Sequence, residues 1–141
     1  MSLEDIQARR EAARAAYESA RAAQYEIDLA ALADIEEEHG YGAVESLPVK
    51  GFTPGIPTMA IIRSPGGTRS YFVYTDKVHA AKQDIKQIAN AQLELGRVCL
   101  LYPPPGEVRD AMVKAYPGLF ISCAVRAVKL AELDSEEEKK G

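Results

Sequence analysis

The chain has 141 residues, 47% hydrophobic and 27% charged, and it carries a net charge of -4. This size and composition are typical of one globular domain with a single core. The negative charge argues against nucleic acid as the main partner, because phosphate backbones are bound by clustered Lys and Arg. No apolar run approaches the roughly 18 residues that cross a bilayer, and the first residues lack the apolar core of a signal peptide, so we expect a cytoplasmic protein with no membrane partner.

The first forty residues predict one long helix. Ser2 can cap its start with Asp5 at the third position, neither Pro nor Gly occurs before Gly40, and Ala is the commonest residue. Such a helix would be about 50 Å long, whereas a compact domain of this size has a radius of gyration of roughly 14 Å. Part of the helix must therefore leave the domain or bend back.

The apolar pattern of this helix changes frame near Tyr25. Residues 25–35 carry a strong apolar stripe, which predicts a helix that faces the core. Residues 1–24 hold few large apolar side chains, and we expect them to form an arm that pairs, as a coiled coil, with another copy or another protein. A frayed, solvated helix is the alternative. The arginines of this arm alternate along the sequence with glutamates, a pattern typical of a solvated face.

Three short segments after Gly40 predict strands. Residues 43–49, 58–64 and 70–75 are rich in β-branched and aromatic residues and are separated by turn residues. We expect the second and third segments to form a hairpin around Pro65, Gly66 and Gly67. Residues 58–63 are apolar on both faces, so we expect helices to cover one face of the sheet and a partner to cover part of the other.

The remaining segments predict helices and one more strand. Asp76 is the expected cap of a helix that ends at Gly96. Residues 98–102 predict a short buried strand, which the prolines at 103–105 end. A short helix and a last helix, with Pro117 in its first turn, follow.

The last predicted helix, residues 119–133, is apolar around most of its circumference. Its polar stripe is narrow and consists of Ser122, Arg126, Lys129 and Glu132. A helix of this kind is either the central element of the fold or has one face in an interface with a partner. The pattern favours both readings equally.

These elements predict an α+β fold with a long N-terminal helix, a small antiparallel sheet with a hairpin, and three helices packed on it. The predicted organisation is a helical arm over residues 1–24, an α+β domain over 25–133 and a charged, disordered tail over 134–141.

Residues that could carry chemistry are few. Cys99 and Cys123 lie in apolar segments, which favours two buried, reduced side chains over a disulfide. The two histidines, His39 and His79, are not spaced with the cysteines as a thiol nucleophile or a zinc site would require. We therefore expect no enzymatic activity, no cofactor and no metal.

The seven tyrosines are a clearer sign of function. Tyr offers rigid, amphipathic area that suits protein interfaces, although half-buried core positions are the alternative for most of them. The candidate set joins three of these tyrosines to apolar residues of the arm and of the last helix. The candidate partner-binding residues are Ile6, Ala13, Tyr17, Tyr71, Tyr74, Phe120 and Val128.

A series of short motifs spans residues 35–133: a helix ending in EEEHG, a strand ending in Arg63-Ser64-Pro65, a helix, VCLLYP, and AYPGLF leading into an apolar helix. This succession resembles the tail assembly chaperones of tailed bacteriophages. In that family the Arg-x-Pro strand passes fairly directly into a helix, whereas we expect a further strand here, and the first twenty residues have no obvious counterpart in the family. The resemblance implies a small, mostly helical, non-enzymatic protein that binds the tape measure protein, frequently as a multimer, and is absent from the finished particle.

Two functions are therefore expected. The first is an assembly chaperone that holds a long helical client, such as a tape measure protein, in the host cytoplasm. The second is a permanent structural or adaptor subunit of a phage particle or another assembly, interlocked by its N-terminal helix and located in the virion. Both imply a protein partner and favour a homo-oligomer.

Overall fold

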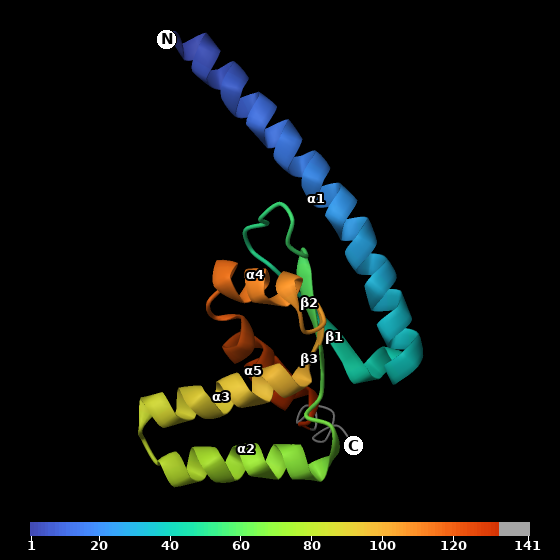
Figure 1. Ribbon diagram of the computed structural model, residues 1–141, viewed down its shortest axis with the longest axis vertical. Coiled ribbons are helices and arrows are strands. Elements are labelled where there is room, and N and C mark those ends of the chain that lie inside the picture. The colour runs from blue at the N-terminus through green and yellow to red at the C-terminus, as the bar shows by residue number, and fades with distance from the viewer. Residues whose placement is uncertain (133–141) are drawn as a thin grey trace, which may run out of the picture.

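The computed structural model describes residues 1–132, with backbone only at 67 and 68 (Figure 1). The predicted α+β class is confirmed, and the expected tail over 134–141 lies outside the described residues. In chain order the elements are α1 (Leu3–His39), a 3-10 turn (Tyr41–Ala43), β1 (Val44–Pro48), β2 (Met59–Arg63), α2 (Gly67–Ala81), α3 (Ile85–Cys99), β3 (Leu100–Tyr102), α4 (Glu107–Ala115) and α5 (Leu119–Leu130).

The long helix α1 is uninterrupted over 37 residues. Ser2 and Asp5 form a capping box at its start, in which the Ser2 hydroxyl accepts from the Asp5 amide at 3.1 Å and the Asp5 carboxylate accepts from the Ser2 amide at 3.2 Å. It ends at Gly40, whose φ of 97° favours glycine. Both predicted limits are confirmed. The N-terminal part of α1 projects well past the rest of the molecule (Figure 1).

The sheet is antiparallel and has the order β1-β2-β3. The central strand β2 is buried on both faces, as its apolar pattern predicted. On one face, Met59 and Ile61 pack with Val44 against Leu32 and Ile35 of α1. The expectation that a partner covers part of the sheet is therefore wrong for this face, because the chain's own long helix covers it.

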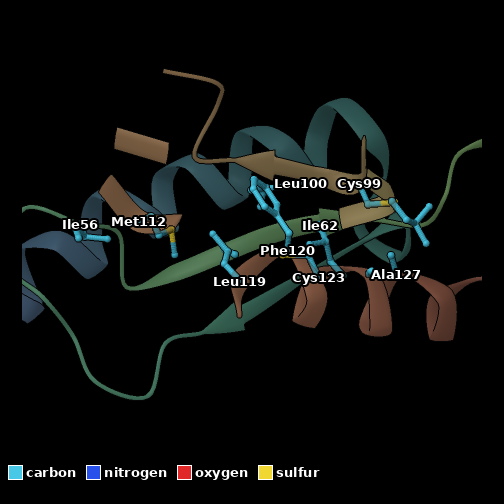
Figure 2. Close-up of a cluster of buried hydrophobic side chains, with 12 residues drawn as sticks. Ile56, Ile62, Cys99, Leu100, Met112, Leu119, Phe120, Cys123 and Ala127 are labelled. Atoms are coloured by element: carbon cyan, nitrogen blue, oxygen red, sulfur yellow. The ribbon is translucent and has the colours of Figure 1, made fainter. Parts of the chain in front are cut away.

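The larger core lies on the other face of β2, where α3, α4 and α5 pack. Figure 2 shows Ile62 of β2 among side chains from all three helices. Cys123, Ala124 and Ala127 of α5 are fully buried there, while Arg126 is exposed and pairs with Glu45 of β1, the cross-strand neighbour of Ile62. Of the two readings of the last helix, the structure thus supports a central element of the fold.

The helices α3 and α5 approach each other closely in this core. A Cβ atom placed on Gly96 would lie 2.0 Å from the backbone oxygen of Phe120, so only glycine fits at the crossing. The predicted helix end at Gly96 is wrong, because α3 continues to Cys99. This glycine serves helix packing rather than helix termination.

The predicted strand over 70–75 and its hairpin with β2 are also wrong, because these residues belong to α2. Tyr71, Tyr74 and Val78 are partly buried and Ala81 is buried, which is a three-four spacing along the side of α2 that packs on α3. The helix predicted to begin after Asp76 is in fact two helices. Asp84 caps the second, since its carboxylate accepts from the amides of Lys86 at 3.0 Å and Gln87 at 3.3 Å.

Candidate protein-binding surfaces

The residues considered for chemistry lie on separate elements: His39 ends α1, His79 is in α2, Cys99 ends α3 and Cys123 is in α5. Both thiols are buried, as predicted. Burial raises the pKa of each thiol, that of Cys123 to about 12 with a contribution from neighbouring Cys99, so both stay in the unreactive protonated form. Within residues 1–132, no three His, Cys, Asp or Glu side chains gather as a metal ion would require.

The length and apolar content of the helices show whether any of them has the properties of a membrane span. Over the part of the chain that the structure describes, no single helix has both the length and the apolar content of a membrane span. α4 and α5 reach that content only when taken together, and they meet at a bend of 96°.

A buried carboxylate fixes α1 to the sheet. Asp28 is fully buried and accepts four hydrogen bonds: from the Thr58 amide and hydroxyl, both at 2.6 Å, from the Tyr102 hydroxyl at 2.6 Å and from the Gln24 side chain at 2.9 Å. Thr58 precedes β2 and Tyr102 ends β3, so one side chain joins the long helix to two strands. A carboxylate with this many donors is well compensated for burial.

This cluster, which we call the Asp28 hub (Gln24, Asp28, Thr58 and Tyr102), also sets the protonation of its tyrosine. Burial, and then the hydrogen bond to Asp28 and its negative charge, raise the pKa of Tyr102 well above its ordinary value. Sequence reasoning missed the hub. The available signal was a pair of polar residues, Gln24 and Asp28, on the face of α1 that also carries Leu32 and Ile35.

Tyr17 makes the next contact towards the N-terminus. Its hydroxyl accepts from the Phe52 amide at 3.0 Å, and the two rings meet edge to face with centroids 5.8 Å apart. Phe52 belongs to the loop over residues 49–58, and this loop is also held by Tyr116, whose hydroxyl donates to the Gly51 carbonyl at 2.6 Å. Residues 1–16 are all exposed, and we call them the free arm.

The free arm has two chemically different sides. At about 100° per residue, Leu3, Ile6, Ala13 and Tyr17 continue the line of α1 that faces the sheet farther down. Leu3 is 70% exposed and Ile6 is 43% exposed. The same half of the helix carries Arg9, Arg10, Arg14 and Arg21, whereas the opposite half carries Glu4, Asp5, Glu11 and Glu18.

Charges that alternate along the sequence are therefore segregated in space. We call the side with the arginines the basic face; it consists of Leu3, Ile6, Ala13, Tyr17, Arg9, Arg10, Arg14 and Arg21. A solvated helix is expected to carry mixed charge and no apolar stripe. This side instead carries positive charge beside an apolar stripe. The basic face is the strongest candidate for a binding surface.

A second surface is a groove of about 540 Å³ between α1 and the proline-rich turn before α4. Gln24 and Ile27 form one wall, and Tyr102, Pro104 and Val108 line the other side. Ile27 is 60% exposed, so the groove offers apolar area to solvent. It begins on α1 about two helical turns beyond Tyr17.

A third apolar area lies on α2 and α3, which pack side by side, with α2 as the outer helix (Figure 1). Phe72 and Val73 of α2 are exposed, and Ile85 at the start of α3 is exposed more than either. An ion pair between Lys77 and Glu94 joins the two helices.

The predicted partner-binding residues fall into three groups. Ile6, Ala13 and Tyr17 share the basic face. Tyr71 and Tyr74 are half-buried on α2 instead of standing on a strand. Phe120 is only 8% exposed, with Arg97 over its ring at 5.3 Å, and Val128 packs against the core, so the domain itself occupies both side chains.

No protein-family model, curated protein or solved structure matches the chain significantly.

Proposed function

We propose that the protein is a non-enzymatic assembly chaperone of the type found with phage tails, and that it holds a long helical client such as a tape measure protein. One observation carries the proposal: a free arm of about 24 Å projects from a folded domain with apolar side chains exposed along one side. Exposed apolar area of this kind on a helix is typical of coiled-coil or helix-in-groove recognition.

The order of elements gives further support. β2 ends at Arg63, and α2 begins at Gly67, one residue beyond Ser64-Pro65. The strand that we expected at this point, and that departed from the phage chaperone pattern, is absent from the described residues. The succession of strand, helix, short strand and apolar helix therefore resembles that family more closely than the sequence pattern alone did.

The proposal is tested by co-expression with a client. A long, helix-rich protein encoded beside this gene is produced alone, with the full chain, and with a chain that lacks residues 1–16. We expect the client to stay in the soluble fraction with the full chain and to precipitate in the other two cases. A client whose solubility is the same in all three cases would contradict the proposal.

The alternative function, a permanent structural subunit, makes a different prediction about the particle. Mass spectrometry of purified particles should lack peptides of this protein if it is an assembly chaperone. Peptides at the stoichiometry of a structural component would favour the interlocking subunit and overturn the chaperone.

A further inference from the structure

We infer that the basic face binds an amphipathic helix of another protein, and that aspartate and glutamate side chains border the apolar stripe of this partner helix. The inference rests on the proposed function, because it names the chemistry of the client. It follows from the shape of the face, its charge and its fixed direction.

The basic face has a shape that can accommodate a helix. Ile6 and Ala13 form the floor of a shallow depression of about 260 Å³, and Arg9 and Arg10 form its borders. A second depression, lined by Gln7, Arg10 and Arg14 together with Glu11, lies beside it. An apolar floor with charged borders is the arrangement by which paired helices exclude water at the centre and choose partners at the edges.

The charge of the face determines which partner fits. All four arginines of residues 1–21 lie in this half of the helix, and the four acidic residues of the same segment lie in the other half, where Glu11 and Glu18 border the face beside Arg14. The one ion pair that the described residues contain in this segment, between Arg14 and Glu18 at 4.0 Å, is exposed and contributes little to stability. A partner with acidic borders would supply the missing counter-charges.

A second copy of the chain does not satisfy this requirement through the same face. Two basic faces laid together would bring Arg9, Arg10 and Arg14 of one copy against the same residues of the other. Like charges at the edges of paired helices disfavour the pair. Of the two partners expected for the arm, another copy or another protein, the charge pattern therefore favours another protein.

The direction of the face is fixed by the domain. The Asp28 hub and the contact between Tyr17 and Phe52 set the rotation of α1 about its axis, so the basic face looks to the side on which the 49–58 loop lies.

The test uses the full chain and two synthetic peptides, each about four heptads long, with Leu and Ile at the core positions. One peptide has Glu at all bordering positions and the other has Lys. Binding is measured by fluorescence anisotropy at low salt. Since each exposed ion pair contributes only a little and several would form, we expect the Glu peptide to bind about tenfold more tightly than the Lys peptide.

Two variants with equal change in net charge locate the site. The first neutralises the basic face and should lose the preference for the Glu peptide: Arg9→Gln, Arg10→Gln, Arg14→Gln. The second adds three negative charges to the opposite side and should keep the preference: Ala8→Glu, Ala12→Glu, Ala15→Glu. Circular dichroism verifies that both variants keep their helix content.

Three outcomes would overturn the inference. The first is that both peptides bind equally well or that neither binds, and the second is that both variants lose the preference equally. The third is a dimer that becomes a monomer when residues 1–16 are deleted. The last outcome would show that a second copy occupies the face. The inference and the proposed function can fail separately. A client that stays soluble only with the full chain, in a protein that ignores the Glu peptide, would retain the function and reject the acidic partner.

Discussion

The two halves of α1 have similar local structure but different surroundings. Both are helical and rich in alanine, yet one half is held by the Asp28 hub and by Leu32 and Ile35, while the other stands free in solvent. On the side of α1 that faces the domain, polar and apolar residues have partners within the domain from the C-terminal end of the helix back to Tyr17. The residues on the same side that precede Tyr17 are exposed. The local sequence is thus enough to form the helix, whereas a few residues on one side decide which part of the helix attaches to the domain.

If the domain holds all the stabilising contacts, a change at its tightest contact should have the largest effect. We expect Gly96→Ala to lower the free energy of unfolding by about 3 kcal/mol, because the added methyl group meets the backbone of Phe120, which cannot move away as a flexible side chain could. Urea unfolding measures the loss. Gly42→Ala is the matched control, since open space surrounds that position. Equal losses in the two variants would show that α3 and α5 are farther apart than described.

The attachment of α1 is tested at the hub. Asp28→Ala leaves the Thr58 and Tyr102 donors buried without an acceptor, and we expect it to cost about 2–4 kcal/mol. Asp34→Ala removes an exposed carboxylate from the same helix and should change stability by less than about 0.5 kcal/mol. Hydrogen exchange should also become faster along residues 20–35 in the first variant alone. Unchanged exchange there would mean that apolar contacts suffice to hold the helix.

Alkaline pH should weaken the domain through its buried thiols. In the unfolded chain, a cysteine ionises near its ordinary pKa of 9.0, whereas Cys123 in the folded chain stays protonated to about 12. The unfolded state alone gains from deprotonation between these values, so stability is intact below pH 9 and falls above it, by up to about 1.4 kcal/mol per pH unit for this group.

Unfolding curves recorded between pH 8 and 11 measure this slope, to which Cys99 and, above pH 10, Tyr102 add in the same direction. Cys123→Ala is the control, and its slope should be smaller than that of the natural chain. A slope that the substitution leaves unchanged would assign the pH dependence to other groups.

The smallest effect is expected from the free arm. Deletion of residues 1–16 should change the free energy of unfolding by less than about 0.5 kcal/mol, since these residues are exposed throughout. Tyr17→Ala in the full chain removes a hydrogen bond and a ring contact and should cost about 1 kcal/mol. If the deletion destabilises the chain more than Tyr17→Ala does, the arm contributes to the domain and the contrast drawn between the two halves is wrong.

The parts of the fold that the sequence predicted are those that local chemistry decides. Ser2, Asp5 and Gly40 act within one turn of their own helix, so the limits of α1 could be predicted from neighbouring residues alone. β2 has apolar residues on both faces and no competing helical spacing, so its strand was also evident.

The failures arose where distant contacts override local preference. Residues 70–75 have the β-branched and aromatic content of a strand, but the spacing of Tyr71, Tyr74 and Val78 matches a helix packed on α3. Gly96 looked like a stop because its close neighbour, Phe120, is 24 residues away in sequence. The hub could not be predicted for the same reason, since Asp28 gains its partners only when α1 and the sheet come together.

The candidate binding residues divide in the same way. Ile6, Ala13 and Tyr17 follow from the helical period and share the basic face. The separation of charge on that face is not visible in the linear sequence, because arginines and glutamates alternate there. They separate only when they are placed around the helix. Phe120 and Val128 are apolar in either setting, and their burial depends on the crossing of α5 with α3.

The continuity of α1 has a consequence for binding kinetics and affinity. An isolated segment of 16 residues would be a marginal helix in water, because the first turn is costly to form. Here the half held by the hub acts as a permanent nucleus, and each residue of the free arm only extends it. A partner that docks on the arm is spared most of the backbone ordering, about 1–2 kcal/mol per residue, that a flexible tail would impose. A contact of a few turns can then give useful affinity and still release its partner quickly.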